Sequence, residues 1–305
     1  MQLTGCRLAA LTAAAVCVVS VLASAGCGAA SGLPARGGSA AGARTSAGAS
    51  TSASANTPGG SGTPGSTGKA ASPRPSAGPA SSPVTLPLAG KVVGIDPGHN
   101  GGNFDDPGYI DRLVWNGREY ETCDTTGTET AGGYTEAQFN FNVASYLRAD
   151  LIKDGAKVVM TRRSDDGVGP CVTTRAEIIN EAHADVAIDI HADGAAPAGR
   201  GFTVLEPVAD GPNENVIQAS IRFGADVRAA LLRYTSMPES DYYGHGGFIL
   251  RDDLAGLNLT TVPKVLVECG NMPNPTDARL LTSPSFQREL AVAFTAAIIE
   301  FLTRR

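Results

Sequence analysis

The stretch KVVGIDPGHNGG, residues 91–102, decides the fold. Its first five residues are rich in β-branched side chains, which predicts a short buried strand. Asp96-Pro97-Gly98 then ends the strand, because proline fixes φ and glycine tolerates a sharp turn. His99 follows on a loop past the carboxyl end of this strand, and that edge of an open α/β sheet is where ligands bind. A single histidine there is weak evidence, so its meaning depends on which side chains the rest of the chain brings to the same edge.

Strands and helices alternate through residues 88–305. Two capping-box patterns, Thr135 with Gln138 and Thr174 with Glu177, predict the starts of two helices. Two further helices are expected over residues 215–233 and 285–302, and strands are expected over residues 157–161, 186–190, 201–206 and 264–268. This order predicts a three-layer α/β domain with a central, largely parallel twisted sheet flanked by helices.

The N-terminal segment has the features of an export signal. Residues 1–26 combine a basic Arg7, an uncharged apolar run and the small-residue sequence Ala23-Ser24-Ala25. The sequence around Cys27 resembles a bacterial lipoprotein cleavage box in which Cys27 is acylated. We therefore expect an exported lipoprotein anchored in the membrane of the cell envelope and facing the cell wall. Plain secretion and an uncleaved anchor are the alternatives.

Residues 27–87 are predicted to be a disordered tether. They are almost entirely Ala, Gly, Ser, Thr and Pro, with no aromatic and no acidic residue, so they cannot bury enough apolar surface to offset their ordering entropy. A chain of this kind spans on the order of 45 Å, which suits a domain that reaches from a membrane into a cell wall. A spacer left over from secretion is the alternative.

The charge of the folded part argues against nucleic acid as a partner. Of 24 Lys and Arg residues and 30 Asp and Glu residues, five basic residues and no acidic residue precede residue 88. The domain over residues 88–305 therefore carries 19 basic and 30 acidic residues, whereas phosphate binding needs a basic surface. We expect a monomer.

Three further side chains are placed to join His99. His191 directly follows the strand over residues 186–190, Glu268 ends the strand over residues 264–268, and Glu136 lies in the first turn of a helix. If the strands are parallel, these groups meet at one edge of the sheet. Two histidines and one carboxylate form a common catalytic zinc set with one open position, and a further carboxylate such as Glu268 can act as general base.

Each of these residues also has an ordinary structural interpretation. A histidine after a strand is commonly a surface residue, Glu136 can simply complement the helix dipole, and Glu268 can be a strand-end charge. The sequence contains no HExxH pair. The residues alone leave both the zinc site and the structural roles open.

Five stretches together resemble a known family. They are VVGIDPGHNGG (residues 92–102), the helix that begins at Glu136, TRRSDDG (161–167), TTRAEIINEAHADVAIDIHAD (173–193) and VPKVLVECGNMPNPTDARLL (262–281). Over about residues 89–304 the chain resembles the type-3 catalytic domain of zinc-dependent N-acetylmuramoyl-L-alanine amidases. The likeness is greatest to the stand-alone amidases of mycobacteria and related actinobacteria.

The resemblance implies that His99, Glu136 and His191 bind Zn²⁺ and that Glu268 is the catalytic glutamate. It also implies hydrolysis of the amide between the lactyl group of N-acetylmuramic acid and the L-alanine of the stem peptide, with peptidoglycan or muropeptides as substrate. The competing hypotheses are a zinc peptidase that cuts within the stem peptide and a non-catalytic lipoprotein that binds muropeptides.

Three positions depart from the family pattern. Asp189 stands where the family usually has Ser, Asp193 where it usually has Asn, and Cys269 where it has an aliphatic residue. These departures bear on substrate recognition more than on catalysis.

Other polar residues are weaker candidates. His245, in a glycine-rich stretch, and Asn271, just past Glu268, are candidate substrate contacts, with an ordinary loop or turn role as the alternative. We expect Arg162 and Arg175 to form structural ion pairs.

The cysteines fit an oxidising location. Cys123 and Cys171 both lie in loops, so we predict a disulfide between them. Cys269 ends a buried strand and is expected to be a free, packed thiol.

Overall fold

The computed structural model describes residues 85–304. The strands are β1 (Val92–Pro97), β2 (Leu113–Trp115), β3 (Tyr120–Thr122), β4 (Lys157–Met160), β5 (Val186–Asp193), β6 (Thr203–Pro207), β7 (Phe248–Arg251) and β8 (Lys264–Asn271). The helices are α1 (Pro107–Ile110), α2 (Glu136–Lys153), α3 (Val172–Glu181), α4 (Ile217–Tyr234), α5 (Ala255–Asn258), α6 (Pro275–Leu281) and α7 (Pro284–Thr303). Two 3-10 turns, η1 (Asn103–Asp105) and η2 (Glu214–Val216), complete the elements.

A six-stranded sheet in the order β4-β1-β5-β8-β6-β7 forms the centre of the domain. Strands β4, β1, β5 and β8 are parallel to one another, whereas β6 runs antiparallel to β8 and β7 runs parallel to β6. The predicted three-layer domain with a largely parallel sheet is therefore confirmed. Because β1, β5 and β8 are adjacent and parallel, their carboxyl ends lie at the same edge.

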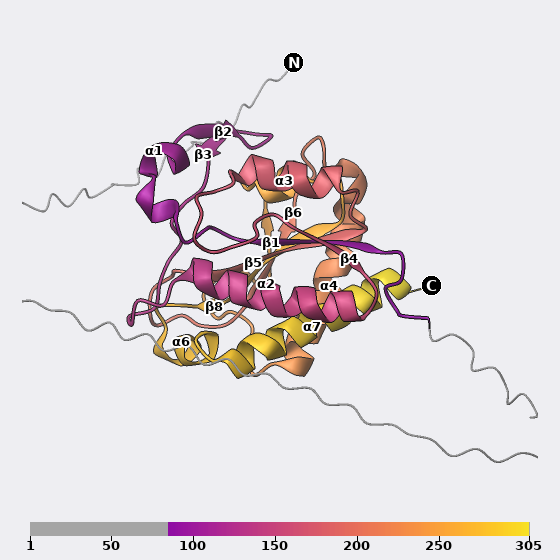
Figure 1. Cartoon of the computed structure of the whole chain (residues 1–305). Helices are drawn as coiled ribbons and strands as arrows, with labels where there is room; N and C mark the ends of the chain where they lie inside the picture. The colour runs from indigo at the N-terminus through magenta and orange to yellow at the C-terminus, as the bar shows by residue number, and fades with distance from the viewer. Residues whose placement is uncertain (1–84, 305) are drawn as a thin grey trace, which may run out of the picture. The chain divides into compact units, whose positions relative to one another are not determined.

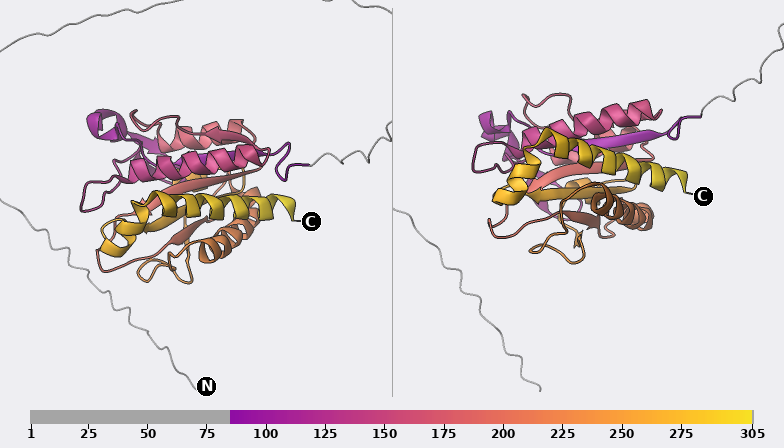
Figure 2. Two further views of the ribbon diagram at one scale, coloured as in Figure 1. Left: turned by 60° about the horizontal axis from the view of Figure 1, so that its bottom comes forward. Right: turned by 90° about the horizontal axis from the view of Figure 1, so that it is seen from below.

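Helices cover both faces of this sheet (Figures 1 and 2). Helices α2, α4 and α7 pack together on one face, and α3 and α5 pack together on the other. The side chains of β5 alternate accordingly: Ile188 and Ile190 are buried in the large core with Phe139 of α2. Asp189 and His191 point to the opposite face, where the sheet carries polar and charged groups.

The two predicted helix starts have different outcomes. Helix α2 begins after Thr135, whose hydroxyl accepts a hydrogen bond from the backbone N–H of Gln138 at 3.3 Å, as predicted. The capping box at Thr174 is wrong, because α3 begins after Cys171 and Thr174 already lies within its first turn. Cys171 is held by a disulfide, so a tertiary constraint sets this helix start in place of the local capping signal.

A small antiparallel hairpin, β2–β3, and strand β7 were not anticipated. On the outer face of the hairpin, Trp115 and Tyr120 contact each other edge to face and remain 50% and 66% exposed. The hairpin is tied to the segment before α5. Glu121 accepts a hydrogen bond from the N–H of Ala255 at 2.9 Å, and Asn116 donates one to the carbonyl of Asp253 at 3.1 Å.

The predicted signal over residues 1–26, the lipidation site at Cys27 and nearly all of the tether over residues 27–87 lie outside the described residues. Among residues 85–304, no helix is both long and apolar enough to cross a membrane.

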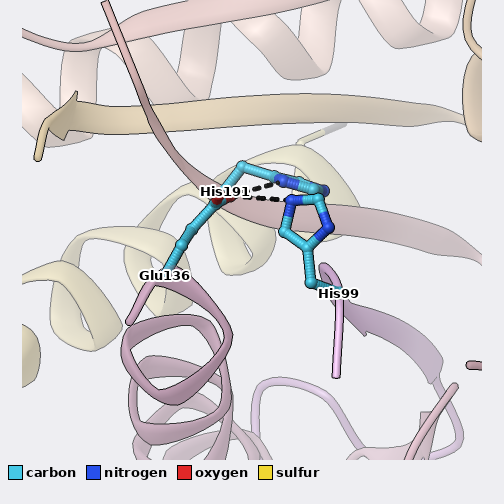
Figure 3. Close-up of side chains that lie close together, drawn as sticks. All are labelled: His99, Glu136 and His191. Atoms are coloured by element: carbon cyan, nitrogen blue, oxygen red, sulfur yellow. Dashed lines mark hydrogen bonds and ion pairs between the residues drawn. The ribbon is translucent and has the colours of Figure 1, made fainter. Parts of the chain in front are cut away.

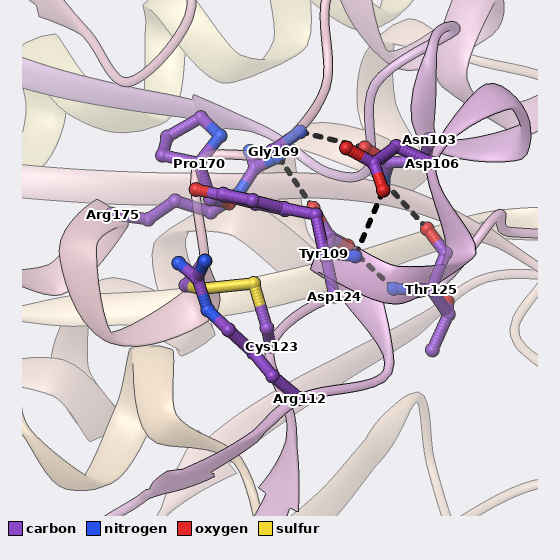
Figure 4. Close-up of a disulfide and its surroundings, with 11 residues drawn as sticks. Asn103, Asp106, Tyr109, Arg112, Cys123, Asp124, Thr125, Gly169, Pro170 and Arg175 are labelled. Carbon is purple, nitrogen blue, oxygen red and sulfur yellow. Dashed lines mark hydrogen bonds and ion pairs between the residues drawn. A yellow bond between two sulfur atoms is a disulfide. The ribbon is translucent and has the colours of Figure 1, made fainter.

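The predicted disulfide between Cys123 and Cys171 is present (Figure 4). Cys269 is a free, fully buried cysteine, also as predicted. Burial, together with the nearby carboxylates of Glu268 and Glu136, raises the pKa of its thiol well above the ordinary value.

Reduction of the disulfide should lower the thermal stability of the domain. The bond closes a loop of 48 residues, and the chain-entropy estimate for such a loop is about 4 kcal/mol. For a domain of this size, that corresponds to a fall in Tm of roughly 8 to 16 °C, measurable by circular dichroism with and without reductant. A Cys123→Ser/Cys171→Ser double variant is the control, because reductant should not lower its Tm further. An unchanged Tm after verified reduction of the wild-type protein would contradict the prediction.

A second prediction concerns Glu206 of β6, which is 8% exposed and has no ion-pair partner within residues 85–304. Its carboxylate abuts α4, since a Cβ at Gly224 would come within 2.5 Å of it. Burial raises the pKa of Glu206 from 4.5 to about 7, so its ionisation favours the unfolded chain and stability falls as the pH rises through this window. The substitution Glu206→Gln should therefore raise the free energy of unfolding by about 2 kcal/mol more at pH 8 than at pH 4.5.

Urea unfolding at the two pH values measures this difference. The matched control is Glu177→Gln, which changes an exposed glutamate of α3 and should leave the pH dependence of stability as in the wild type. Equal effects of Glu206→Gln at both pH values would rule out the proposed ionisation.

Candidate metal centre

The carboxyl edge of the sheet brings together the side chains predicted from the sequence. His99 lies just past the end of β1, and His191 lies in the last part of β5. Glu268 of β8 is the register partner of His191, so the two side chains project from the same face of neighbouring strands. The parallel arrangement thus places residues from three distant parts of the sequence at one site.

The carboxylate of Glu136, at the first position of α2, faces both histidines (Figure 3). One of its carboxylate oxygens is 3.2 Å from Nε2 of His99 and 2.9 Å from Nδ1 of His191. The carboxylate is itself held in place by the backbone N–H groups of Thr128 at 3.0 Å and Ala192 at 3.2 Å. A ligand atom from each of the three side chains lies within 4.8 Å of the others, which is a spacing that a single metal ion can bridge.

Two glycines allow this close approach. A Cβ at Gly98 would lie 2.0 Å from the ring of His191, and a Cβ at Gly127 would lie 2.8 Å from both the Glu136 carboxylate and the His99 ring. Gly127 also has a φ of +72°, a conformation that other residues rarely adopt. No larger residue fits either position without displacing a member of the cluster.

The electrostatics of the cluster favour a positive charge between its members. Burial alone would lower the pKa of His99, but the carboxylates of Glu136 and Asp124 outweigh burial and raise that pKa to about 10. Burial alone would raise the pKa of Glu136, but the two imidazoles hold it well below the ordinary value. The site therefore combines a carboxylate with two imidazoles in a buried environment that stabilises a cation.

Glu268 has a different environment from Glu136. Burial raises the pKa of Glu268 well above its ordinary value, and the nearby carboxylates of Glu136 and Asp193 raise it further. Its Oε2 atom is buried and has no hydrogen-bond partner within the described part of the chain. Glu136 is thus an ionised partner of the two imidazoles. Glu268, in contrast, has a raised pKa and one carboxyl oxygen without a hydrogen-bond partner in the described part of the chain.

Comparisons with known proteins show the family of this chain. The profile of the N-acetylmuramoyl-L-alanine amidase family matches residues 93–300. The chain belongs to this family. It is 39% identical over 218 residues to the N-acetylmuramoyl-L-alanine amidase Rv3717 of Mycobacterium tuberculosis, covering 70% of this chain and 88% of that protein.

Solved structures show the same fold. The N-acetylmuramyl-L-alanine amidase Ami1 from Mycobacterium smegmatis superposes with a TM-score of 0.67 and 39% identity, covering 72% of this chain and 99% of that one. The apo form of Ami1 from Mycobacterium abscessus gives a TM-score of 0.65 and 38% identity, covering 70% and 100% of the two chains.

Beneath the candidate centre, the amidase contains a buried network of charges. Arg175 pairs with Asp96 at 2.9 Å and with Asp124 at 3.0 Å, and all three side chains are buried. Arg162 pairs with Asp165 at 2.8 Å and donates to the carbonyls of β1 and α2. The prediction that both arginines form structural ion pairs is confirmed.

Asp124 is the residue that the sequence analysis missed. Its Oδ1 atom is 3.3 Å from Nδ1 of His99, so it contacts a candidate metal ligand directly. The signal available in the sequence was its position next to Cys123, a cysteine already predicted to anchor the loop between His99 and Glu136.

Asp189 and Asp193, the two aspartates that depart from the family pattern, have partners on neighbouring elements. Asp189 is 2.8 Å from Nζ of Lys264, a fully buried lysine on the next strand. Burial raises the pKa of Asp189 to about 7, although Lys264 opposes that shift. Asp193 accepts a hydrogen bond from the hydroxyl of Tyr242 at 2.8 Å. These departures from the family pattern are thus accommodated by local contacts.

The two candidate substrate contacts lie in different settings. Asn271 is buried, and its side-chain amide donates to the carbonyls of Ala196 at 2.9 Å and Gly199 at 2.7 Å, which organises the turn after β5. His245 is exposed, and its backbone pairs with Phe248 at the start of β7. The structure brings neither side chain into the cluster of His99, Glu136 and His191.

A cavity of about 210 Å³ adjoins the candidate centre. It is lined by His99 and His191, by Thr122 of the hairpin, by Ala255 of α5 and by Leu266 of β8. The amidase therefore has a partly apolar space beside two of the three candidate ligands, large enough for a group of a few heavy atoms.

Proposed function

We propose that this protein is a zinc-dependent amidase that hydrolyses the bond between N-acetylmuramic acid and the L-alanine of the peptidoglycan stem peptide. Its role would be the remodelling or turnover of the cell wall. The observation that carries the proposal is that His99, Glu136, His191 and Glu268 converge at one edge of the sheet. The chain that forms this site belongs to the N-acetylmuramoyl-L-alanine amidase family.

The residues present fit a zinc ion. His99 and His191 would supply imidazole nitrogens and Glu136 a carboxylate oxygen, the mixed donor set of catalytic zinc sites with an open position. The raised pKa of His99 and the lowered pKa of Glu136 both report a local preference for positive charge, which a divalent cation would satisfy. When bound, zinc would lower the pKa of a coordinated water toward ~7 and polarise the amide carbonyl.

Glu268 would act as the general base and then as the general acid. Its carboxylate takes a proton from the attacking water and gives a proton to the amide nitrogen as the carbon–nitrogen bond breaks. Water and the amide are thereby converted into a lactyl carboxylic acid and a free α-amine. Burial raises the pKa of Glu268, which favours its role as the proton donor to the leaving amine.

The same proposal includes the placement of the enzyme. Residues 1–26 would be a signal of the lipoprotein type, Cys27 the lipid anchor, residues 27–87 the tether and residues 88–305 the catalytic domain. An exported location is supported by the disulfide between Cys123 and Cys171, because such bonds persist in oxidising compartments.

Mass spectrometry of a digested muropeptide tests the activity. Purified protein should release an intact stem peptide with a free N-terminal alanine, and a chelator should abolish the release until zinc is added back. Cleavage at an internal peptide bond would indicate a stem-peptide peptidase instead. Absence of cleavage on both muropeptides and whole cell walls would favour a binding protein or an enzyme that needs an activator.

The substitution Glu268→Gln should abolish activity while leaving zinc bound. The amide keeps the shape of the side chain but cannot take a proton, so kcat should fall by about 10² to 10⁴. Steady-state kinetics on a muropeptide, with zinc content measured on the same sample, checks this result. Activity within a few-fold of the wild type would remove Glu268 from the mechanism.

The protein should bind one zinc ion per chain, and the His191→Ala variant should lose it. Elemental analysis after dialysis against a weak chelator measures the stoichiometry. The control is His183→Asn, which replaces an exposed histidine at the end of α3 with a residue that tolerates its φ of +49°. Retention of zinc by His191→Ala would contradict the assigned ligand set.

A further inference from the structure

The backbone of His99 is held in an uncommon conformation. Its φ is +56°, in the left-handed region that residues other than glycine rarely adopt. Such a conformation costs on the order of 1 kcal/mol or more and persists only where the surroundings enforce it. Here Arg175 donates to the carbonyl of His99 at 2.8 Å, and Asn140 donates to the carbonyl of Gly98 at 3.1 Å. The neighbouring elements thus fix the candidate ligand from both sides of its backbone.

The ring of His99 is oriented by contacts at the nitrogen that faces away from the cluster. Nδ1 lies 3.3 Å from Oδ1 of Asp124 and 3.1 Å from the carbonyl of Thr125, whereas Nε2 faces Glu136 at 3.2 Å. Two acceptors at Nδ1 favour a proton there, so Nε2 is the nitrogen available to bind a metal ion between the three candidate ligands.

Asp124 is itself held rigidly. It is 4% exposed, its Oδ1 accepts the N–H of Thr125 at 2.8 Å, and its Oδ2 accepts from Arg175 at 3.0 Å. Arg175 is 3% exposed and also bonds Asp96 at 2.9 Å. A continuous buried chain of contacts therefore runs from Arg175 through Asp124 to the ring of His99.

The disulfide joins the two segments that contain Asp124 and Arg175 (Figure 4). Cys123 directly precedes Asp124, and Cys171 lies one helical turn before Arg175, whose N–H donates to the carbonyl of Cys171 at 3.0 Å. The N–H of Val172 also donates to the carbonyl of Cys123 at 2.7 Å. The crosslink thereby fixes Asp124 relative to Arg175.

We propose that Asp124, held by Arg175 and by the Cys123–Cys171 crosslink, is a positioning residue that orients His99 for the metal ion. The proposal rests on the zinc site of the proposed function. Asp124 acts through His99 and is not itself one of the three candidate ligands. Its removal should therefore weaken metal binding first and affect turnover only as a consequence.

The test is the zinc affinity of Asp124→Ala and Asp124→Asn in the full-length, oxidised protein, measured by competition with a chromophoric chelator. The alanine variant should bind zinc about 10- to 100-fold more weakly, as expected for loss of a residue that orients a metal-bound histidine. The asparagine variant keeps one carbonyl acceptor for Nδ1–H but loses the charge that pairs with Arg175, so its affinity should be intermediate. At saturating zinc, both variants should recover most of the wild-type kcat.

The matched control is Asp226→Asn, which removes another arginine-paired carboxylate, the partner of Arg304 on the α4 and α7 side of the domain. Its zinc affinity should equal that of the wild type. Zinc affinities within two-fold of the wild type in both Asp124 variants would overturn the proposal. If the alanine variant fails to fold, the same outcome in the asparagine variant alone overturns it.

The two proposals fail in distinguishable ways. A wild-type protein that binds no zinc would refute the zinc site of the proposed function. A wild-type protein that binds zinc, with Asp124 variants that bind it equally well, would refute only the positioning role.

Discussion

The parallel pairing of β1, β5 and β8 is the constraint on which the candidate site depends. Adjacent parallel strands end at the same edge, so three short segments far apart in the sequence deliver His99, His191 and Glu268 to one place. The fourth member arrives differently, because Glu136 is the first residue of a helix and reaches the same edge through its capped start. Precision at the site thus comes from strand register and one helix cap, both of which are rigid elements of the backbone.

The buried charges beneath this edge bear on the metal ion that we propose there. The buried carboxylates of Asp96, Asp124 and Asp189 are paired with the buried cations Arg175 and Lys264. Glu136 adds a further ionised carboxylate on the side of the histidines. Buried ions are stable only when they are paired and hydrogen-bonded, and the partners of Glu136 are the two imidazoles. In the zinc site that we propose, the metal ion would take over the pairing with Glu136.

Much of this arrangement could be predicted from the sequence, because its signals are local. Short windows of the sequence show a histidine near the carboxyl end of a buried strand, a capping threonine before Glu136 and two cysteines in loops. The hairpin β2–β3 was missed because its strands are three residues long and expose Trp115 and Tyr120, so they show no buried periodicity. The start of α3 after Cys171 was missed because the disulfide joins residues 48 positions apart. No short stretch of sequence shows this constraint, whereas the capping signal at Thr174 is local. Asp124 was missed for a similar reason, since an acidic loop residue gains meaning only from its distance to His99.

The loop between His99 and Glu136 brings these considerations together. Both ends of the loop carry a candidate ligand, yet its interior has only short elements and little core, so ordering it carries a conformational entropy cost that grows with its length. Several interior residues of the loop are attached to other parts of the domain, which lowers the entropy cost of ordering it. Asn103 accepts from Gly169 at 2.7 Å, Cys123 is bonded to Cys171, and Glu121 is bonded to the start of α5. Each attachment shortens the free segment that remains, and the covalent one lies next to the residue that contacts His99. The geometry of the candidate centre is therefore set as much by how this loop is fastened to α3 and α5 as by the sheet from which the ligands project.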